Sequence, residues 1–364
     1  MEEKKTISIP LSLQEKAILH GGLEEIQAVA SGGMAIVFRA KQTKLNRFVA
    51  VKSLKTHLIE NLETRERFRR EAKALASVLH QNVAHVYDFY ETEKEAFIFM
   101  EYIEGIDLSQ AIQKVGALPA EVAAVILLGV CRGVSYIHAH HLIHRDIKPS
   151  NIRLSPKGEV KLMDFGIVMD TDNHSLTRPG MMVGSPSYLS PEQVLGDPLI
   201  YQSDIFLLGI CLYEMMTGTR PFKDEGNKTV FQKIRDCDFI PAQEMNSSIP
   251  RSINKIIQRC LEKDPRDRYE HVSEIILELE AFLGPRRSSR MQDLLLKYLD
   301  EESLLSPSLA YSEALLPRKA WDSSRLSPWI LGAALLVLGC FLGFTAASLS
   351  KPDQVLPSTA KPLK

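Results

Sequence analysis

Hydrophobic and polar residues alternate in short runs through the first hundred residues of the chain. The runs EEIQAVA, AIVFRAK, RFVAVKSL and AFIFMEYI have the period of two that is typical of β-strands. Between them, TRERFRREAKALASVLH places Phe68, Ala72, Leu75 and Leu79 three and four residues apart, which predicts one apolar helix face. Residues 23–101 are therefore expected to form a small sheet with one helix.

From about residue 106 the pattern becomes mostly helical. Four long stretches carry the signal: AEVAAVILLGVCRGVSYIHAHH, SDIFLLGICLYEMMTG, RSINKIIQRCLEK and VSEIILELEAFL. They predict a helical lobe over residues 106–283. A chain of 364 residues exceeds what one ordinary core needs, so two lobes are expected. The fold class predicted for residues 23–283 is therefore α+β and bilobal.

The ends of the chain differ from its middle. Residues 1–22 are predicted to be a leader that lacks the apolar core of a signal peptide. Residues 284–328 mix Pro, Ser and charges and are expected to be a juxtamembrane linker, with a short amphipathic helix around Leu294 to Leu299.

An uncharged run, residues 329–349, follows this linker. As a helix it would span roughly 31 Å, which predicts a transmembrane segment. A buried C-terminal helix is the alternative, but a run without a polar face is hard to bury at a chain end. Residues 350–364 are expected to form a short outer tail without a folded receptor domain.

Composition argues against a few classes of protein and of site. The net charge of −1 lacks the basic excess of a typical nucleic-acid binder, so no nucleic-acid partner is expected. The five cysteines are irregularly spaced and form no Cys-x-x-Cys pair. A disulfide framework or zinc site is therefore not expected, and a reducing compartment fits best.

The sharpest chemical signal is the stretch HRDIKPSN followed by KLMDFG. It sets Asp146 and Asn151 five residues apart in a loop that Pro149 keeps from becoming a helix. Asp164 follows a strand-like run and precedes Gly166, which permits an unusual turn. Converging carboxylate and amide oxygens can hold Mg²⁺, and a further carboxylate can accept a proton from an attacking hydroxyl.

Two upstream motifs complete the pattern. Lys52 ends the strand-like run VAVK, and Glu71 lies on the predicted helix, on the side of Phe68 and Leu75. An unpaired inward charge would be costly, so Lys52 and Glu71 are expected to pair. The small residues of VASGGMAIVFRA lie between two strands, where backbone N–H groups can approach phosphates.

Together these motifs resemble the eukaryotic-like (Hanks-type) serine/threonine protein kinases. The resemblance runs from about Leu23 to Leu283, and GGMAIVFRA and YLSPEQ are most similar to bacterial, membrane-anchored members. It implies ATP and Mg²⁺ as cofactors, with Mn²⁺ as an alternative, and protein Ser/Thr hydroxyls as substrates. The HRDIKPSN form, with Lys148, is similar to serine/threonine kinases, and Ser185 would lie in the segment that receives the substrate hydroxyl.

The resemblance also assigns roles to individual residues. Asp146 would be the catalytic base, Lys148 would stabilise the transferring phosphoryl group, and Asn151 and Asp164 would hold the metal. Lys52 would contact the α- and β-phosphates, positioned by Glu71. The remaining nucleotide contacts are expected from Val29, Ala30, Gly32, Gly33, Met34, Ala35, Val37, Ala50, the gatekeeper-like Met100, Glu101 and Ile103.

Further residues are expected to support the lobes. The resemblance implies an apolar stack that aligns the two lobes and is anchored by Asp204. It also implies a structural ion pair between Glu192 and Arg268. The members of the stack would be Leu75, Val86, His144 and Phe165.

Two departures from the family pattern bear on ATP binding. Ala30 and Ala35 stand where the first and third glycines of the loop are usual, which restricts φ and can crowd a phosphate. Arg153 stands where an aliphatic residue usually lies beneath the adenine, so its head would reach water or stack on the base. A pseudokinase scaffold and a nucleotide-independent membrane-tethered binding module are the alternatives. Only an active kinase transfers phosphate from Mg·ATP.

Regulation is expected at the loop after Asp164. Arg145 beside the catalytic base would need an anion if buried, and a phosphorylated loop hydroxyl would supply one. The resemblance to bacterial relatives makes Thr177, eight residues before Ser185, the first candidate, with Thr171 and Ser175 as alternatives, and simple solvation of any of them is the competing interpretation.

The predicted membrane segment suggests one further partner. Gly339 and Gly343 form a GxxxG pair, which predicts a possible homodimer. Lys and Arg residues are balanced on the two sides of the segment. The need for ATP therefore places the kinase domain on the cytoplasmic side, with a bacterial inner membrane as the expected location.

Overall fold

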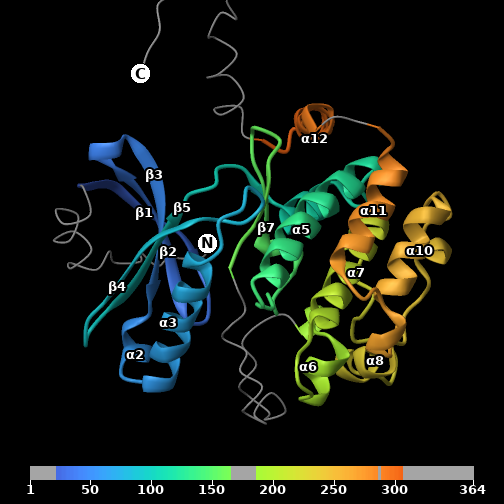
Figure 1. Ribbon diagram of the computed structural model, residues 1–364, viewed down its shortest axis with the longest axis horizontal. Coiled ribbons are helices and arrows are strands. Elements are labelled where there is room, and N and C mark those ends of the chain that lie inside the picture. The colour runs from blue at the N-terminus through green and yellow to red at the C-terminus, as the bar shows by residue number, and fades with distance from the viewer. Residues whose placement is uncertain (1–21, 165–185, 286–287, 306–364) are drawn as a thin grey trace, which may run out of the picture. The chain divides into compact units, whose positions relative to one another are not determined.

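The computed structural model describes residues 22–164, 186–285 and 288–305, which belong to the first of two units of the chain, residues 1–311. The N-terminal lobe is one antiparallel sheet with the strand order β1-β2-β3-β5-β4 (Figure 1). Its elements are β1 (Leu23–Ser31), β2 (Ala35–Gln42), β3 (Arg47–Leu54), α2 (Thr56–Ile59), α3 (Leu62–Ala76), β4 (Val86–Glu91) and β5 (Ala96–Glu101).

Both faces of this sheet are apolar. Val49, Val51 and Phe97 belong to a small core on one face, while Ala50 and Ile98 belong to the large core that includes α3. The period of two in β3 therefore places Lys52 on the face of Ala50, the same face that α3 covers. This is the side on which a partner from α3 can be reached.

The helix α3 is shorter than its sequence pattern suggests. The side chain of Asn61 caps its first turn by accepting a hydrogen bond from the backbone N–H of Thr64, at 2.9 Å. Phe68 and Leu75 are buried as predicted. The expectation for Leu79 is wrong: the helix ends at Ala76, so Leu79 lies beyond it with 68% of its surface exposed.

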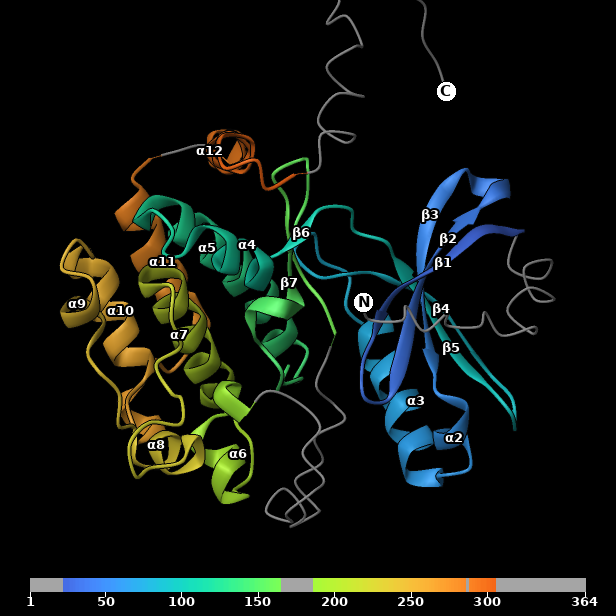
Figure 2. The ribbon, with the colours of Figure 1, turned by 180° about the vertical axis from the view of Figure 1, so that it is seen from behind.

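The C-terminal lobe is mainly helical and also contains a small sheet, β6-β7-β8. Figure 2 shows α7, α10 and α11 grouped with α5. The elements up to the end of the second hairpin are β6 (Ile106–Asp107), α4 (Leu108–Val115), α5 (Ala120–Ala139), β7 (Ile152–Leu154) and β8 (Val160–Leu162). The later helices are α6 (Pro191–Leu195), α7 (Tyr201–Thr217), α8 (Val230–Asp236), α9 (Ala242–Met245), α10 (Arg251–Cys260), α11 (Val272–Leu283) and α12 (Ser288–Glu301).

The central helix α5 is apolar nearly all round because it is surrounded by protein. Thirteen of its residues are buried. Among the described residues it is the one helix long and apolar enough to cross a membrane, but 72% of that window is buried inside the lobe. We therefore interpret α5 as the core helix of the lobe. The transmembrane helix predicted at residues 329–349 lies outside the described residues.

The loop before β4 joins the N-terminal lobe to β8. The backbone N–H of Leu162 donates to the carbonyl of Asn82 at 2.8 Å, and that of Ala84 donates to the carbonyl of Leu162 at 2.9 Å. The side-chain amide of Asn82 adds a bond to the carbonyl of Val160 at 2.9 Å. These bonds satisfy backbone groups that would otherwise be buried without partners.

The packed part of the chain extends beyond Leu283, where the sequence pattern suggested that a linker begins. The amphipathic helix expected near Leu294 is α12, and its residues Met291, Leu295 and Leu299 are buried. A Cβ on Gly158 in the β7–β8 turn would lie 2.7 Å from the carbonyl oxygen of Gln292 in α12. Such a close approach is possible only with glycine.

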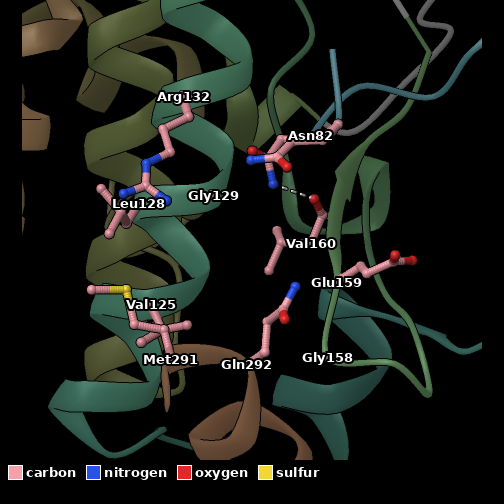
Figure 3. Close-up of a pocket in the computed structure, with 11 residues that line it drawn as sticks. Asn82, Val125, Leu128, Gly129, Arg132, Gly158, Glu159, Val160, Met291 and Gln292 are labelled. Carbon is pink, nitrogen blue, oxygen red and sulfur yellow. Dashed lines mark hydrogen bonds between the residues drawn. The ribbon is translucent and has the colours of Figure 1, made fainter. Parts of the chain in front are cut away.

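A cavity of about 160 Å³ lies beside this contact. Its walls come from α5, α12, the loop before β4 and the β7–β8 turn, with Asn82, Arg132, Met291 and Gln292 around it (Figure 3). Among its described lining residues there is none of the predicted catalytic ones. The cavity is therefore separate from the candidate active site.

The burial of α12 leads to a stability prediction. Leu295→Ala is expected to lower the free energy of unfolding by about 2–5 kcal/mol, because it removes a fully buried side chain. Urea denaturation of the full chain, monitored by circular dichroism, measures the free energy of unfolding. Asp300→Ala on the exposed side of the same helix is the control. Equal unfolding midpoints for the two variants would show that α12 does not pack on the lobe.

Candidate active site

The loop that carries His144, Arg145 and Asp146 is tied to α7 by one buried carboxylate. Asp204, in the first turn of α7, accepts hydrogen bonds from the backbone N–H groups of His144 and Arg145, each at 2.8 Å. The ring Nε2 of His138 donates to the same carboxylate at 2.8 Å. A fully buried carboxylate needs such donors to offset its desolvation. The anchoring role expected of Asp204 is thus present in the geometry.

The loop anchored in this way holds an unusual backbone conformation. Arg145 has φ of +70°, in the left-handed region that residues other than glycine seldom adopt, and Asp164 after β8 has φ of +43°. The carbonyl of Arg145 accepts a bond from the side-chain amide of Gln193 at 2.9 Å, while its N–H is bound by Asp204. The surrounding contacts therefore hold a conformation that would be unfavourable alone.

Asp146 is held between two side chains of its own loop. The Lys148 ammonium lies 2.8 and 2.7 Å from its two carboxylate oxygens, and the amide nitrogen of Asn151 donates to its Oδ2 at 2.9 Å. Asn151 also donates to the backbone carbonyl of Asp146 at 2.8 Å. A 3-10 turn that begins at Pro149 brings these residues together. The arrangement orients the carboxylate of Asp146 as a base requires.

Lys52 is the centre of a second cluster. Its ammonium lies 2.5 Å from Glu71 on α3 and 2.9 Å from Asp164 after β8. The predicted pair between Lys52 and Glu71 is therefore present, and Glu71 is buried as expected. The contact with Asp164 brings together residues 112 positions apart in the sequence.

The mutual attraction within this cluster favours the charged forms of Lys52 and Asp164. Burial alone lowers the pKa of Lys52, but the charges of Asp164 and Glu71 outweigh burial and raise that pKa far above its ordinary value. Burial opposes the ionisation of Asp164, yet Lys52 brings the pKa of that carboxyl below its usual range. Burial also raises the pKa of Glu71, with Lys52 acting in the opposite direction. Lys52 is therefore a fixed positive charge at neutral pH.

The metal ligands expected in the site are few. No group of three or more His, Cys, Asp or Glu side chains suited to a metal occurs within residues 22–164, 186–285 and 288–305. Asn151 uses its amide nitrogen on Asp146, so its amide oxygen is the atom that can bind a cation. Asn151 and Asp164 thus offer one amide oxygen and one carboxylate. Such a pair suits Mg²⁺, which takes few protein ligands together with substrate phosphates.

The glycine-containing turn closes the hairpin of β1 and β2. The N–H of Gly32 donates to the carbonyl of Ala35 at 2.9 Å, and Ala30 pairs with Val37 across the hairpin. None of Ala30, Gly32 and Ala35 has a positive φ. The two alanines therefore adopt ordinary backbone angles, and the restriction of φ that was expected from them causes no backbone strain in this structure. Crowding of a phosphate by their methyl groups stays a prediction.

The other residues expected around a nucleotide lie on β1–β3, on the hairpin turn, at the end of β5 and just after it. Ala50 and Met100 are buried cross-strand partners, and Ile103 is buried. Val37 and Met34 are half-buried, and Val29, Ala30, Gly32 and Gly33 are exposed. The Nη2 of Arg153 donates to the carbonyl of Gly105 at 2.8 Å, a contact that the sequence did not predict, and the side chain is half-buried. Stacking of Arg153 on the base stays a prediction.

The supporting residues lie in the large core. Leu75 and Val86 are buried there, and so is His144, whose Nε2 lies 3.2 Å from the carbonyl of Met163. Burial lowers the pKa of His144, so the ring is neutral at pH 7. Several predicted residues lie outside the described ranges, namely Phe165, Thr171, Ser175, Thr177, Ser185, Gly339 and Gly343.

The predicted ion pair between Glu192 and Arg268 is present and buried. The Arg268 guanidinium lies 2.7 and 3.3 Å from the two carboxylate oxygens of Glu192. It also donates to the carbonyls of Gln202, Glu262 and Lys263. All five N–H donors of this guanidinium are satisfied, as a buried charge requires.

Comparison with known proteins agrees with this geometry. The family model for the protein kinase domain matches residues 23–278. The chain belongs to the protein kinase family. Over 263 residues it is 42% identical to a probable serine/threonine-protein kinase of Clostridium perfringens. The aligned region covers 72% of this chain and 38% of that protein.

Two further relatives carry the same kind of name. Serine/threonine-protein kinase PrkC of Bacillus subtilis is 34% identical over 262 residues, with 72% of this chain and 40% of that protein covered. Serine/threonine-protein kinase PknB of Mycobacterium leprae is 36% identical over 254 residues, with 68% and 41% covered. The chain thus spans about two fifths of the length of these curated relatives.

Two residues near the site are absent from the sequence-based expectations. His138 contacts Asp204, and the repeated histidines of HAHHLIHRD could have drawn attention to it. Lys161 forms an ion pair with Glu101, with 2.8 Å between Nζ and Oε1. In the sequence Lys161 is only the polar residue between Val160 and Leu162, a position typical of a solvent-facing side chain.

The buried pair leads to a prediction with an internal control. Arg268→Ala is expected to lower the free energy of unfolding by about 3–5 kcal/mol, because it leaves the Glu192 carboxylate buried and unpaired. Arg266→Ala removes an ion pair of an exposed arginine two residues away and is expected to change stability much less. Urea denaturation of both variants measures the difference. Equal losses would contradict the structural role of the buried pair.

Proposed function

We propose that this chain is a serine/threonine protein kinase that transfers the γ-phosphate of Mg·ATP to Ser and Thr hydroxyls of proteins. The observation that carries the proposal is the pair of assembled clusters, Lys52 with Glu71 and Asp164, and Asp146 with Lys148 and Asn151. The first supplies a fixed positive charge for phosphates, and the second an oriented base beside a second ammonium. The names of the relatives support the same activity.

In this mechanism the substrate hydroxyl attacks the γ-phosphorus and Asp146 accepts the hydroxyl proton, while the bond from the γ-phosphorus to the β–γ bridging oxygen breaks and ADP leaves. Lys148 and Asn151 hold the Asp146 carboxylate in place, and the Lys148 ammonium adds positive charge near the transferring group. Asn151 and Asp164 would hold Mg²⁺ or Mn²⁺, which when bound neutralises charge on the β- and γ-phosphates. Lys52 would bind the α- and β-phosphates, and the backbone of residues 101–103 would contact the adenine.

A pseudokinase scaffold is the second candidate and is not favoured. A protein of that kind needs neither an oriented base nor a complete set of phosphate and metal ligands. Here Lys52 contacts Glu71 and Asp164 in one cluster, and Asp146 contacts Asn151 in the other.

The activity is tested with purified full chain, Mg²⁺ and radiolabelled ATP. Wild type is expected to label itself and a generic basic protein, and Asp146→Asn to reduce the rate by about a hundredfold or more. Asp300→Asn, an isosteric change on the exposed side of α12, is expected to keep the wild-type rate. Nucleotide binding without labelling in wild type would favour the scaffold, and absence of both would reject the nucleotide site.

We also propose that Thr177 is an autophosphorylation site that raises activity. The supporting observation is the guanidinium of Arg145, whose Nε is buried without a hydrogen-bond partner in the described part of the chain. A phosphate nearby would supply the missing acceptor. Mass spectrometry of the labelled protein locates the phosphate. A Thr177→Ala variant as active as wild type, with Thr171 and Ser175 also unmodified, would reject the proposal.

Membrane attachment through residues 329–349 is part of the proposed function, with the kinase domain on the cytoplasmic side. Its support is the uncharged run of bilayer length, and Gly339 with Gly343 would pair two copies. The full chain is expected to stay in the membrane fraction after alkaline carbonate washing. Release of the chain into the supernatant would contradict attachment by a spanning helix. Replacing both glycines with leucine without loss of self-association would contradict the dimer.

A further inference from the structure

Two cations stand directly opposite each other on the β7–β8 hairpin. Arg153 on β7 and Lys161 on β8 are partners in the antiparallel register, so their side chains leave the same face of the hairpin. Both are partly buried. Like charges in opposed positions destabilise a strand pair, so this placement needs acceptors nearby.

The acceptors belong to the two ends of one short segment, residues 101–105, which links β5 to β6. The Lys161 ammonium lies 2.8 and 2.9 Å from the two carboxylate oxygens of Glu101, the first residue of the segment. The Arg153 guanidinium donates to the carbonyl of Gly105, the last residue, at 2.8 Å. The hairpin thus holds this segment, called the hinge below, at both of its ends.

Further contacts fix the same two ends. The Glu101 carboxylate accepts the N–H of His85 at 3.2 Å, and the N–H of Glu101 donates to the carbonyl of His85 at 2.8 Å. At the other end, a Cβ on Gly105 would lie 2.0 Å from the carbonyl oxygen of Leu154, so only glycine fits beside β7. Gly105 has φ of +123°, which also favours glycine. Neither end of the hinge can shift without breaking a polar contact.

We propose that Lys161 is a positioning residue for nucleotide binding, and that Arg153 assists it from the far end of the hinge. By binding the Glu101 carboxylate, Lys161 holds the backbone of residues 101–103 in the conformation that contacts the adenine. The proposal rests on the proposed function, which assigns the adenine to this backbone. A hinge held in its binding conformation loses less entropy when the nucleotide binds, so affinity rises.

This assignment also accounts for an arginine at a position where the family pattern has an aliphatic residue. The Arg153 guanidinium donates its hydrogen bond to the Gly105 carbonyl of the hinge, and the side chain lies on the face of the hairpin that it shares with Lys161. Arg153 therefore contributes to the shape of the site through the backbone.

The test compares variants of the full chain in two binding assays and one rate assay. Lys161→Met is expected to raise the Kd for Mg·ADP and the KM for ATP about tenfold, a change of about 1.4 kcal/mol, with kcat within about twofold. Lys161→Arg, which keeps the charge, is expected to restore both constants. Lys157→Met, an exposed lysine in the same hairpin, is expected to leave them unchanged.

Inorganic tripolyphosphate separates positioning of the hinge from a general structural role. It has phosphates but no adenine, so its affinity is expected to be equal in wild type and Lys161→Met. Equal weakening of tripolyphosphate and ADP would overturn the proposal, and so would an unchanged Kd for ADP in Lys161→Met. If wild type binds ADP but transfers no phosphate, the kinase activity is rejected while the ADP measurement still decides the role of Lys161.

Discussion

The active-site geometry depends on the buried carboxylate of Asp204. It gathers the N–H groups of His144 and Arg145 and the ring of His138 onto the first turn of α7. Loss of this acceptor would leave three donors without this partner, and for the buried N–H of His144 the cost is about 1–3 kcal/mol. The left-handed conformation of Arg145 is kept by these bonds, and Asp146 follows directly in the chain. The direction of the proposed base is therefore set by a residue about sixty positions further along the sequence.

The C-terminal lobe can hold several charged side chains near its buried strands because each of them lies against a group of opposite charge. Asp146 lies against Lys148, Asp164 against Lys52, and Lys161 against Glu101. Pairs of this kind contribute little net stability, because desolvation offsets much of the attraction. Their value is positional, since each pair fixes a functional group on one element against another.

The N-terminal lobe is held to the strands of the C-terminal lobe at three places. Asn82 is bound to β8, Lys52 to Asp164, and Glu101 to Lys161. All three contacts lie on or just after one strand, β8. A movement of β8 would therefore change the loop before β4, the lysine proposed to bind phosphates and the hinge together, which gives this short strand an influence beyond its three residues.

The amino-acid sequence was enough to predict the kinds of helix and strand, the order of the motifs and the pairing of Lys52 with Glu71. Periodicity reveals which face of an element is apolar, and the cost of an unpaired buried charge predicts that Lys52 and Glu71 meet. The family resemblance added the roles of Asp146, Asn151 and Asp164, and the buried pair of Glu192 with Arg268.

Tertiary structure alone decided the rest. The end of α3 before Leu79 and the packing of α12 on the C-terminal lobe depend on which surfaces are left to cover, and local pattern does not contain that information. The same holds for the partners of Arg153 and Lys161. The alternation of a strand predicts which face a polar residue lies on. The acceptors of Arg153 and Lys161, however, lie 48 and 60 residues away in the sequence, and only the folding of the chain brings them close.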